Sequence, residues 1–174
     1  MKFVRAAVVL GLLAAAVLPE WRRYQGDRLL WRMHAVSDAL LADADPPAAA
    51  RRALAGMSRS AAEAAAALPG DPRPWMIASE ARFEARDFPG ALADLRRASA
   101  SGERADVDFE MGRAFVLEKE FAAAQQALVR AAWISPAVLA PLPESARASL
   151  EDEVARLEGE LRRGRLNAPP PRPR

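Results

Sequence analysis

A spacing of aromatic, alanine and leucine residues occurs twice in this 174-residue sequence. The pattern F-x-x-A-x-x-x-L-x-x-A begins at Phe88 and begins again at Phe121, so its period is 33 residues. A period of this length is typical of stacked helical hairpins, in which each repeat buries its apolar face against its neighbours. We therefore expect two tandem hairpins, at about residues 72–104 and 105–137.

These two repeats resemble the tetratricopeptide family. Repeat one has Trp75 at the family's tryptophan position, and repeat two has Gly112, Phe115 and Pro136 at further positions of the pattern. Repeat two departs from the pattern at its own tryptophan position, which is Asp108. The resemblance implies an α-solenoid of antiparallel helical hairpins over residues 72–137.

The residue types within the repeats have a physical reason. Alanine at four repeated positions permits paired helices to approach closely, while aromatic residues and leucine fill the wedges between helices; the alanines are Ala91, Ala98, Ala124 and Ala131. Gly112 permits a tight crossing at a helix-propensity cost of about 1 kcal/mol relative to alanine. Pro136 follows the last helix, where it prevents continuation.

The rest of the chain is expected to be helical as well, because alanine, leucine, arginine and glutamate are strong helix formers. Two repeats alone bury too little surface, so flanking helices are expected to cap them. Segment 138–164 contains a helix over about 144–163 with an apolar seam at Leu150, Val154, Leu157 and Leu161. We interpret it as a capping helix; the alternative is a short coiled coil with a second copy through residues 150–161.

Residues 20–71 are expected to form helices that precede the repeats. Leu29, Met33, Val36 and Leu40 recur on one face of a helix over 21–42. Asp45 and Pro46 suit the start of the next helix, and the capping-box spacing of Ser60–Glu63 leaves open a second start there. Trp31 stands where Trp75 stands in repeat one, so a degenerate further hairpin is the alternative for this segment.

Residues 1–19 combine a basic start with an apolar run from Ala6 to Leu18 that Pro19 follows. The run is a membrane anchor, for which it is short, or a signal peptide cleaved after Ala16, or a buried helix of a soluble protein. Aromatic and basic residues follow it as in a membrane interface: Trp21, Arg22, Arg23 and Tyr24. The expected location is the bacterial inner membrane, single-pass with a periplasmic body; the alternative is an exported soluble periplasmic protein.

Charge and cysteine content exclude several classes of function. Residues 70–161 hold 17 acidic and 11 basic side chains, and both ends of the chain are basic. An acidic core does not bind nucleic acid, because phosphate contacts need a basic face. The sequence has no cysteine, which removes disulfides, thiolate metal sites and a cysteine nucleophile. Residues 165–174, rich in proline and arginine, are expected to be a disordered or polyproline II tail.

The family resemblance also implies a concave groove in which a peptide or a partner helix docks. Its positions in repeat one are Arg73, Met76, Glu80, Phe83 and Glu84, and in repeat two Asp106, Phe109, Arg113 and Val116. Four of these positions are apolar where a bare groove leaves them half-exposed, which is typical of a helix receptor. The alternative is that the chain's own helix, from 21–42 or 144–163, fills the groove.

Catalysis, a metal and a cofactor are not expected. His34 is the single histidine and lies in a helical apolar period, and no glycine-rich phosphate loop follows a strand. We therefore expect a non-enzymatic interaction scaffold or adaptor of a bacterial cell-envelope assembly, tethered by its N-terminal helix. The alternative is a structural accessory subunit that is permanently packed in a membrane protein complex.

Overall fold

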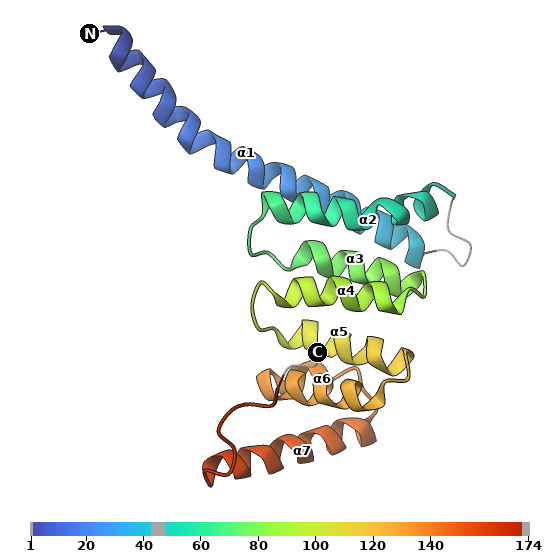
Figure 1. Ribbon diagram of the computed structural model, residues 1–174. Helices are drawn as coiled ribbons and strands as arrows, with labels where there is room; N and C mark the ends of the chain where they lie inside the picture. Colours follow the sequence, from blue (N-terminus) through green and yellow to red (C-terminus); the bar gives the residue numbers. More distant parts are fainter. Residues whose placement is uncertain (1, 43–47, 172–174) are drawn as a thin grey trace. The chain divides into compact units, whose positions relative to one another are not determined.

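The computed structural model describes residues 2–42 and 48–171, and all regular structure in these residues is helical. The all-α prediction is thereby confirmed. The elements are α1 (Lys2–Leu41), α2 (Ala48–Ala67), α3 (Arg73–Glu84), α4 (Phe88–Ser99), α5 (Ala105–Leu117), α6 (Phe121–Ile134), the 3₁₀ helix η1 (Pro136–Leu139) and α7 (Glu144–Arg162) (Figure 1). The chain forms two compact units, Met1–Ala81 and Arg82–Arg174, and α3 contributes to both.

In the N-terminal unit, the second half of α1 lies beside α2 (Figure 1). Leu30 and Met33 of α1 are buried in one cluster with residues of α2 and α3: Met57, Ala61, Ala64, Ile77, Ala78 and Ala81. The alanines let the helices approach closely, so the two large α1 side chains are removed from water. Burial of each such side chain stabilises the unit by about 1.5–3 kcal/mol.

Both helices of this unit continue through positions where the sequence allows a break. Helix α1 was expected to begin at Trp21, but it begins at Lys2 and continues through Pro19. An internal proline removes one backbone hydrogen bond and crowds the carbonyl four residues earlier. Helix α2 is continuous through Gly56 and Ser60, so the proposed second start at Ser60 is wrong. Its alanine-rich sequence sustains the helix without a new cap. The expected cap at Asp45 and Pro46 lies outside the described residues, as does the side chain of Leu40.

Of the helices in the described part of the chain, none is both long enough and apolar enough to cross a membrane. Trp31 is 72% exposed, whereas Trp75 packs against the core of its unit. The two tryptophans therefore occupy different environments. A degenerate further hairpin in residues 20–71 therefore stays a prediction.

In the C-terminal unit, α4 packs against α5, α5 against α6, and α6 against η1 and α7. The four repeated alanines are at most 2% exposed, as their proposed role in close packing requires. Gly112 also permits close packing of α5 and α6. A Cβ at this position would lie only 2.6 Å from Cγ of Leu128 on α6. Phe121 was expected to fill a wedge between helices. This prediction is wrong, because Phe121 is 66% exposed.

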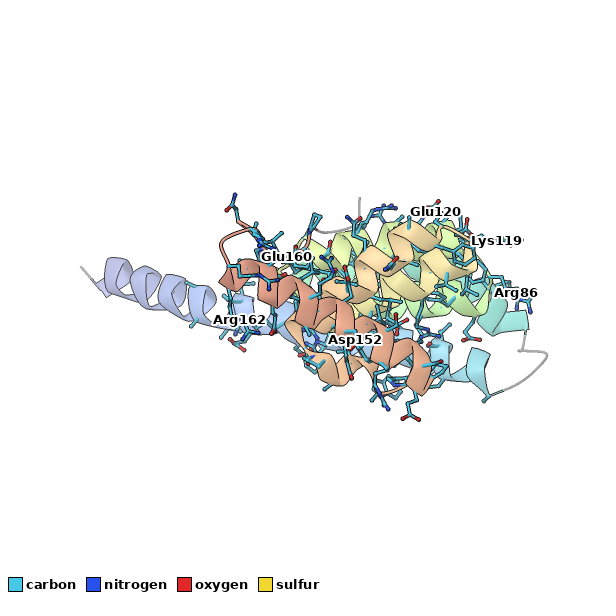
Figure 2. The ribbon with its side chains drawn as sticks, turned by 90° about the horizontal axis from the view of Figure 1, so that it is seen from below. Arg86, Lys119, Glu120, Asp152, Glu160 and Arg162 are labelled. Carbon is cyan, nitrogen blue, oxygen red and sulfur yellow. The ribbon has the colours of Figure 1, made fainter. Side chains whose placement is uncertain are left out.

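The 33-residue period is visible in the backbone of two turns. Arg86 and Lys119 both have left-handed backbones, with φ of 57° and 64°. The next residue at each turn donates its N–H to the helix before it, Asp87 to Arg82 O and Glu120 to Phe115 O, both at 2.9 Å. Figure 2 shows Arg86, Lys119 and Glu120 at the same end of this unit. The sequence repeat is thus accompanied by a repeated helix–turn–helix geometry.

Candidate functional site

The groove positions of repeat one in the N-terminal unit are polar or only half-buried. Arg73 forms an ion pair with Asp71 at 2.6 Å and lies 3.5 Å from Asp27 on α1. Its hydrogen bonds to Asp71 raise the pKa of Arg73. Met76 is half-buried and Glu80 is exposed. Arg73 therefore forms ion pairs within its own unit, where it connects α3 to α1.

Within the C-terminal unit, the ends of α3 and α5 form a small surface of mixed character. The Arg113 guanidinium lies over the ring of Phe83, 5.5 Å from its centroid, and Phe83 in turn contacts Phe88 with 6.1 Å between ring centroids. Val116, one turn beyond Arg113 on the same helix face, is 44% exposed, and Glu84 is exposed as well. We call Phe83, Glu84, Arg113 and Val116 the α3–α5 surface.

Phe109 does not belong to this surface. It was expected to be half-exposed, but it is 7% exposed and packs in a core with residues of α6, η1 and α7, among them Val129, Leu139 and Leu150. The chain's own C-terminal elements therefore cover Phe109. Filling of the groove by residues 144–163 stays a prediction. The physical reason is that α7 needs an apolar partner, and Phe109 supplies part of it.

Asp106, the first groove position of α5, has a local structural role. Its carboxylate accepts hydrogen bonds from Arg104 at 2.6 Å and from the Val107 N–H at 3.0 Å. These hydrogen bonds, led by the one from Arg104, lower the pKa of Asp106. A negative charge in the first turn also interacts favourably with the helix dipole. Asp106 thus stabilises the start of α5.

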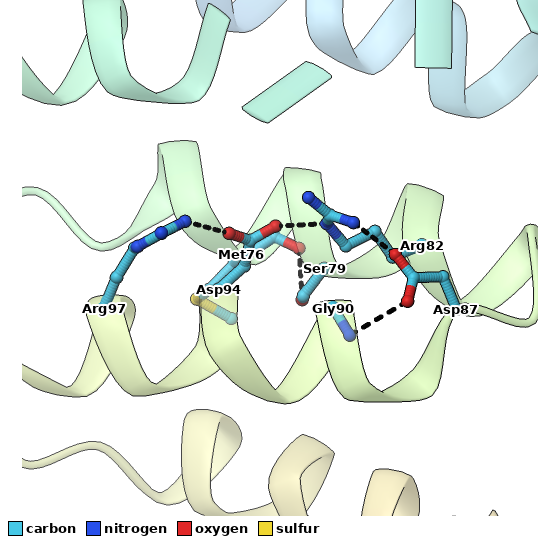
Figure 3. A network of polar contacts seen from close by, with 7 residues as sticks. All are labelled: Met76, Ser79, Arg82, Asp87, Gly90, Asp94 and Arg97. Atoms are coloured by element: carbon cyan, nitrogen blue, oxygen red, sulfur yellow. Dashed lines mark hydrogen bonds and ion pairs between the residues drawn. The ribbon is translucent and has the colours of Figure 1, made fainter. Parts of the chain in front are cut away.

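A buried ion-pair network at the start and middle of α4 was missed by sequence reasoning (Figure 3). Asp94 is fully buried and accepts from Arg82 Nε at 2.8 Å and from Arg97 Nη1 at 2.7 Å. Arg82 also pairs with Asp87, whose other oxygen accepts from the Gly90 N–H at 3.0 Å. Burial lowers the pKa of Arg82, but the hydrogen bonds to Asp94 and Asp87 outweigh burial and raise it.

This network gives Arg82 a structural role within the hairpin of α3 and α4. Arg82 connects the end of α3 to the cap and the interior of α4 through charge-assisted hydrogen bonds. Every carboxylate of the network is neutralised by an arginine within the same unit. We therefore assign it a role in holding the hairpin together and not in binding a ligand.

A recess lies between α6, α7 and the tail, with a volume of about 590 Å³. Its lining is mainly apolar and comes from three segments: Ala122, Ala123, Gln125, Gln126 and Val129 of α6, Glu153 and Leu157 of α7, and Leu166, Pro170 and Pro171 of the tail. The tail is held by Arg130, which donates to the Pro170 carbonyl at 2.5 Å and pairs with Glu103.

Two residues of the tail lie against the unit, since Pro170 is buried and Leu166 is half-buried. No sequence pattern indicates this, because the contact joins residues 40 positions apart through a buried arginine. Residues 172–174 lie outside the described part of the chain.

The apolar seam of α7 also packs inward. Leu150 is buried, and Val154 and Leu157 pack against the same core, while Leu161 is 39% exposed. Three of the four seam residues thus pack against the core of their own chain. Pairing of two copies through residues 150–161 stays a prediction, with little apolar surface to support it.

The predicted membrane-interface residues lie on a free part of α1. Residues 15–25 are exposed on all sides of the helix. Trp21 and Tyr24 are 54% and 57% exposed, and their ring centroids are 5.7 Å apart. Arg23 pairs with Glu20 at 3.2 Å. The first buried residue that follows is Gly26, where α1 meets Leu68 at the end of α2.

Comparisons with protein-family models, with curated proteins and with solved structures give no match. In the described residues, no group of three or more histidine, aspartate or glutamate side chains is placed to hold a metal ion. The chain offers three surfaces on which a partner could bind: the α3–α5 surface, the recess beside α6 and the exposed part of α1.

Proposed function

We propose that this protein is a non-enzymatic interaction scaffold of a bacterial cell-envelope assembly, and that a segment of a partner protein binds its tetratricopeptide-like repeats at the α3–α5 surface. The observation that carries the proposal is the combination of an accessible Arg113–Phe83 stack with the exposed Val116 next to it. Arginine and aromatic side chains are enriched where binding energy concentrates in protein interfaces.

The repeated hairpins support this assignment. Two turns with the same backbone geometry at a spacing of 33 residues are what a repeat array requires, and such arrays commonly bind extended segments of other proteins. The self-covered Phe109 restricts the proposed site to the C-terminal end of α5, so the partner segment is short and contacts Val116 and Arg113 before the α5–α6 turn.

The envelope location is proposed from the N-terminal sequence. The basic start, the apolar run and the following Trp21–Tyr24 are typical of a chain that is targeted to a membrane or across it. Mass determination of the mature protein separates the two expectations: a retained N-terminal segment begins at Met1, and a cleaved signal leaves a chain that begins at Val17.

Site-specific photocrosslinking tests the binding site. A photoreactive amino acid replaces Val116 in the full-length chain produced in its own bacterium, and a matched probe replaces Asp152, which projects from α7 (Figure 2). We expect one discrete, stoichiometric protein adduct from position 116 and none from position 152. Equal labelling of many proteins from both positions, or no adduct from either, refutes the proposal.

Arginine substitutions provide a second control. Arg113 and Arg156 are both exposed, and each pairs with a glutamate three residues earlier in its helix. Only Arg113 lies over an aromatic ring of the proposed surface. We expect Arg113→Ala to reduce the yield of the adduct about tenfold, as for an interface residue worth roughly 1–2 kcal/mol, and Arg156→Ala to leave it unchanged. Equal effects of the two substitutions contradict the assignment.

A further inference from the structure

Helix α1 has a second apolar face, opposite to the one that packs on α2. The packed face is formed by Gly26, Leu30, Met33 and Ser37, all buried. On the other side of the helix, at spacings of four and three residues, lie Val17, Trp21, Tyr24, Arg28 and Trp31, which we call the outer ridge. Its four apolar members are 59%, 54%, 57% and 72% exposed.

The length of the outer ridge restricts the orientation of α1 at a membrane. From Val17 to Trp31 the helix rises by about 21 Å, and from Trp21 to Trp31 by about 15 Å. Each interfacial layer of a bilayer is only roughly 5–8 Å thick. An upright α1 that places Trp21 in this layer leaves Trp31 in water, whereas an α1 parallel to the surface places the whole ridge at one depth.

The charges along the ridge select the kind of surface it fits. In this stretch, the two acidic side chains have basic neighbours: Glu20 pairs with Arg23, and Asp27 lies 3.5 Å from Arg73. Arg28, at the centre of the ridge, and Arg32, one turn further, form no ion pair within the described residues. The uncompensated charge of the outer ridge is therefore positive, which favours an anionic surface.

The residue types favour lipid over a partner helix. Interdigitating helices use leucine, isoleucine and valine along a seam, and a central arginine would be costly there. Tryptophan and tyrosine, with an apolar ring and a polar edge, prefer the boundary between headgroups and acyl chains. Amphipathic helices that lie in this boundary combine such rings with basic residues.

We propose that the outer ridge lies flat on an anionic lipid bilayer, with its aromatic rings at the headgroup–acyl boundary and Arg28 and Arg32 on lipid phosphates. α1 is then an in-plane contact and not an upright span. This inference depends on the membrane location in the proposed function but not on the protein partner. A negative result for the outer ridge therefore does not count against partner binding at the α3–α5 surface.

Nitroxide labels measure the depth of α1 directly. Because the sequence has no cysteine, Val17→Cys, Ala35→Cys and Glu63→Cys each give a single labelling site in the full-length chain. Position 35 continues the line of the ridge beyond Trp31 and leaves every aromatic residue in place, and Glu63 is exposed on α2. The proteins are reconstituted with vesicles that contain one anionic lipid, phosphatidylglycerol, in phosphatidylcholine, and with vesicles of phosphatidylcholine alone.

The accessibility of each label to oxygen and to a water-soluble nickel complex gives its depth. We expect the labels at 17 and 35 to lie at the same interfacial depth in anionic vesicles, and the label at 63 to lie in water. A label at 35 in water while the label at 17 is in the membrane refutes the in-plane contact and indicates an upright helix. A label at 35 shielded from both reagents without vesicles indicates a protein neighbour, including a second copy, and also refutes it.

A charge reversal tests the role of Arg28. Arg28→Glu is compared with Arg59→Glu, which reverses an exposed arginine on α2. We expect Arg28→Glu to lower the ratio of interfacial to aqueous label at position 35 by about tenfold or more in anionic vesicles, and Arg59→Glu to change it by less than about twofold. The same ratio in both variants, or in anionic and neutral vesicles, refutes an electrostatic contact at the ridge.

Discussion

Substituting alanine for Gly112 places a methyl group between α5 and α6 at a point where the two helices pack closely. A Cβ at this position lies 2.6 Å and 2.7 Å from Cγ and Cδ2 of Leu128, and 3.4 Å from the Ala124 carbonyl oxygen. Carbon atoms at van der Waals contact are about 3.5–4.0 Å apart, so Leu128 or the helix itself must move by roughly 1 Å.

Two opposing effects determine how Gly112→Ala changes the free energy of unfolding. Alanine is favoured over glycine inside a helix by about 1 kcal/mol. Overpacking of a close helix contact costs about 1–3 kcal/mol. Because Leu128 Cγ is a branch point and not the free end of a side chain, we take the cost in the middle of this range. The expected net result is a destabilisation of about 1 kcal/mol.

Gly159→Ala is the matched control in the same unit. Gly159 lies inside α7, and a Cβ added there approaches only the flexible Arg163 guanidinium, at 3.4 Å. This substitution gains the propensity of alanine without a clash, so we expect it to stabilise the unit by up to about 1 kcal/mol. The two glycine-to-alanine changes should therefore have opposite signs.

Urea unfolding of the full-length chain in a mild detergent, followed by circular dichroism, measures both variants. The unfolding midpoint should fall for Gly112→Ala and rise for Gly159→Ala, with the slope against urea unchanged. A double-mutant cycle with Leu128→Ala isolates the cause, because removal of the leucine side chain should abolish the cost at position 112. If Gly112→Ala stabilises, or costs the same with and without Leu128, the inferred close approach is wrong.

Three further predictions concern single residues of the C-terminal unit. Asp94→Asn should destabilise it by about 2–3 kcal/mol, which is less than the roughly 3–5 kcal/mol for a fully buried ion pair, because both arginines keep access to water. Asp152→Asn should destabilise it by less than about 0.5 kcal/mol, and thermal unfolding of the two variants compares them. Lys119→Gly should stabilise the unit by about 0.5–1 kcal/mol, since glycine adopts the left-handed backbone without strain, and a lower urea midpoint would contradict this. Because its folded pKa is lowered, Asp106 contributes stability that is present above about pH 4 and lost as the pH falls through the folded pKa. The difference between the wild type and Asp106→Asn should therefore be constant from about pH 5 to 7 and shrink as the pH falls below about 4. A difference that is as large at pH 3 as at pH 7 refutes this.

The candidate site was only partly predictable from the sequence. The resemblance to the tetratricopeptide family implied Arg113 and Val116 as groove positions, and both are accessible in the structure. The same resemblance failed for Phe109, because a repeat pattern specifies a helix face and not which other elements cover it. The recess beside α6 was missed, since it requires Arg130 to meet a tail carbonyl 40 residues away.

The sequence by itself determined the local features of this protein. Helix-forming composition, the period of 33 residues and small residues at Ala91 and Ala124 follow from propensity and spacing, which act over one or two helical turns or one repeat. Tertiary structure decided the features that depend on distant neighbours. These include the burial of Phe109, the position of Pro170, the left-handed turn at Lys119 and the free outer face of α1, because burial depends on which elements pack together.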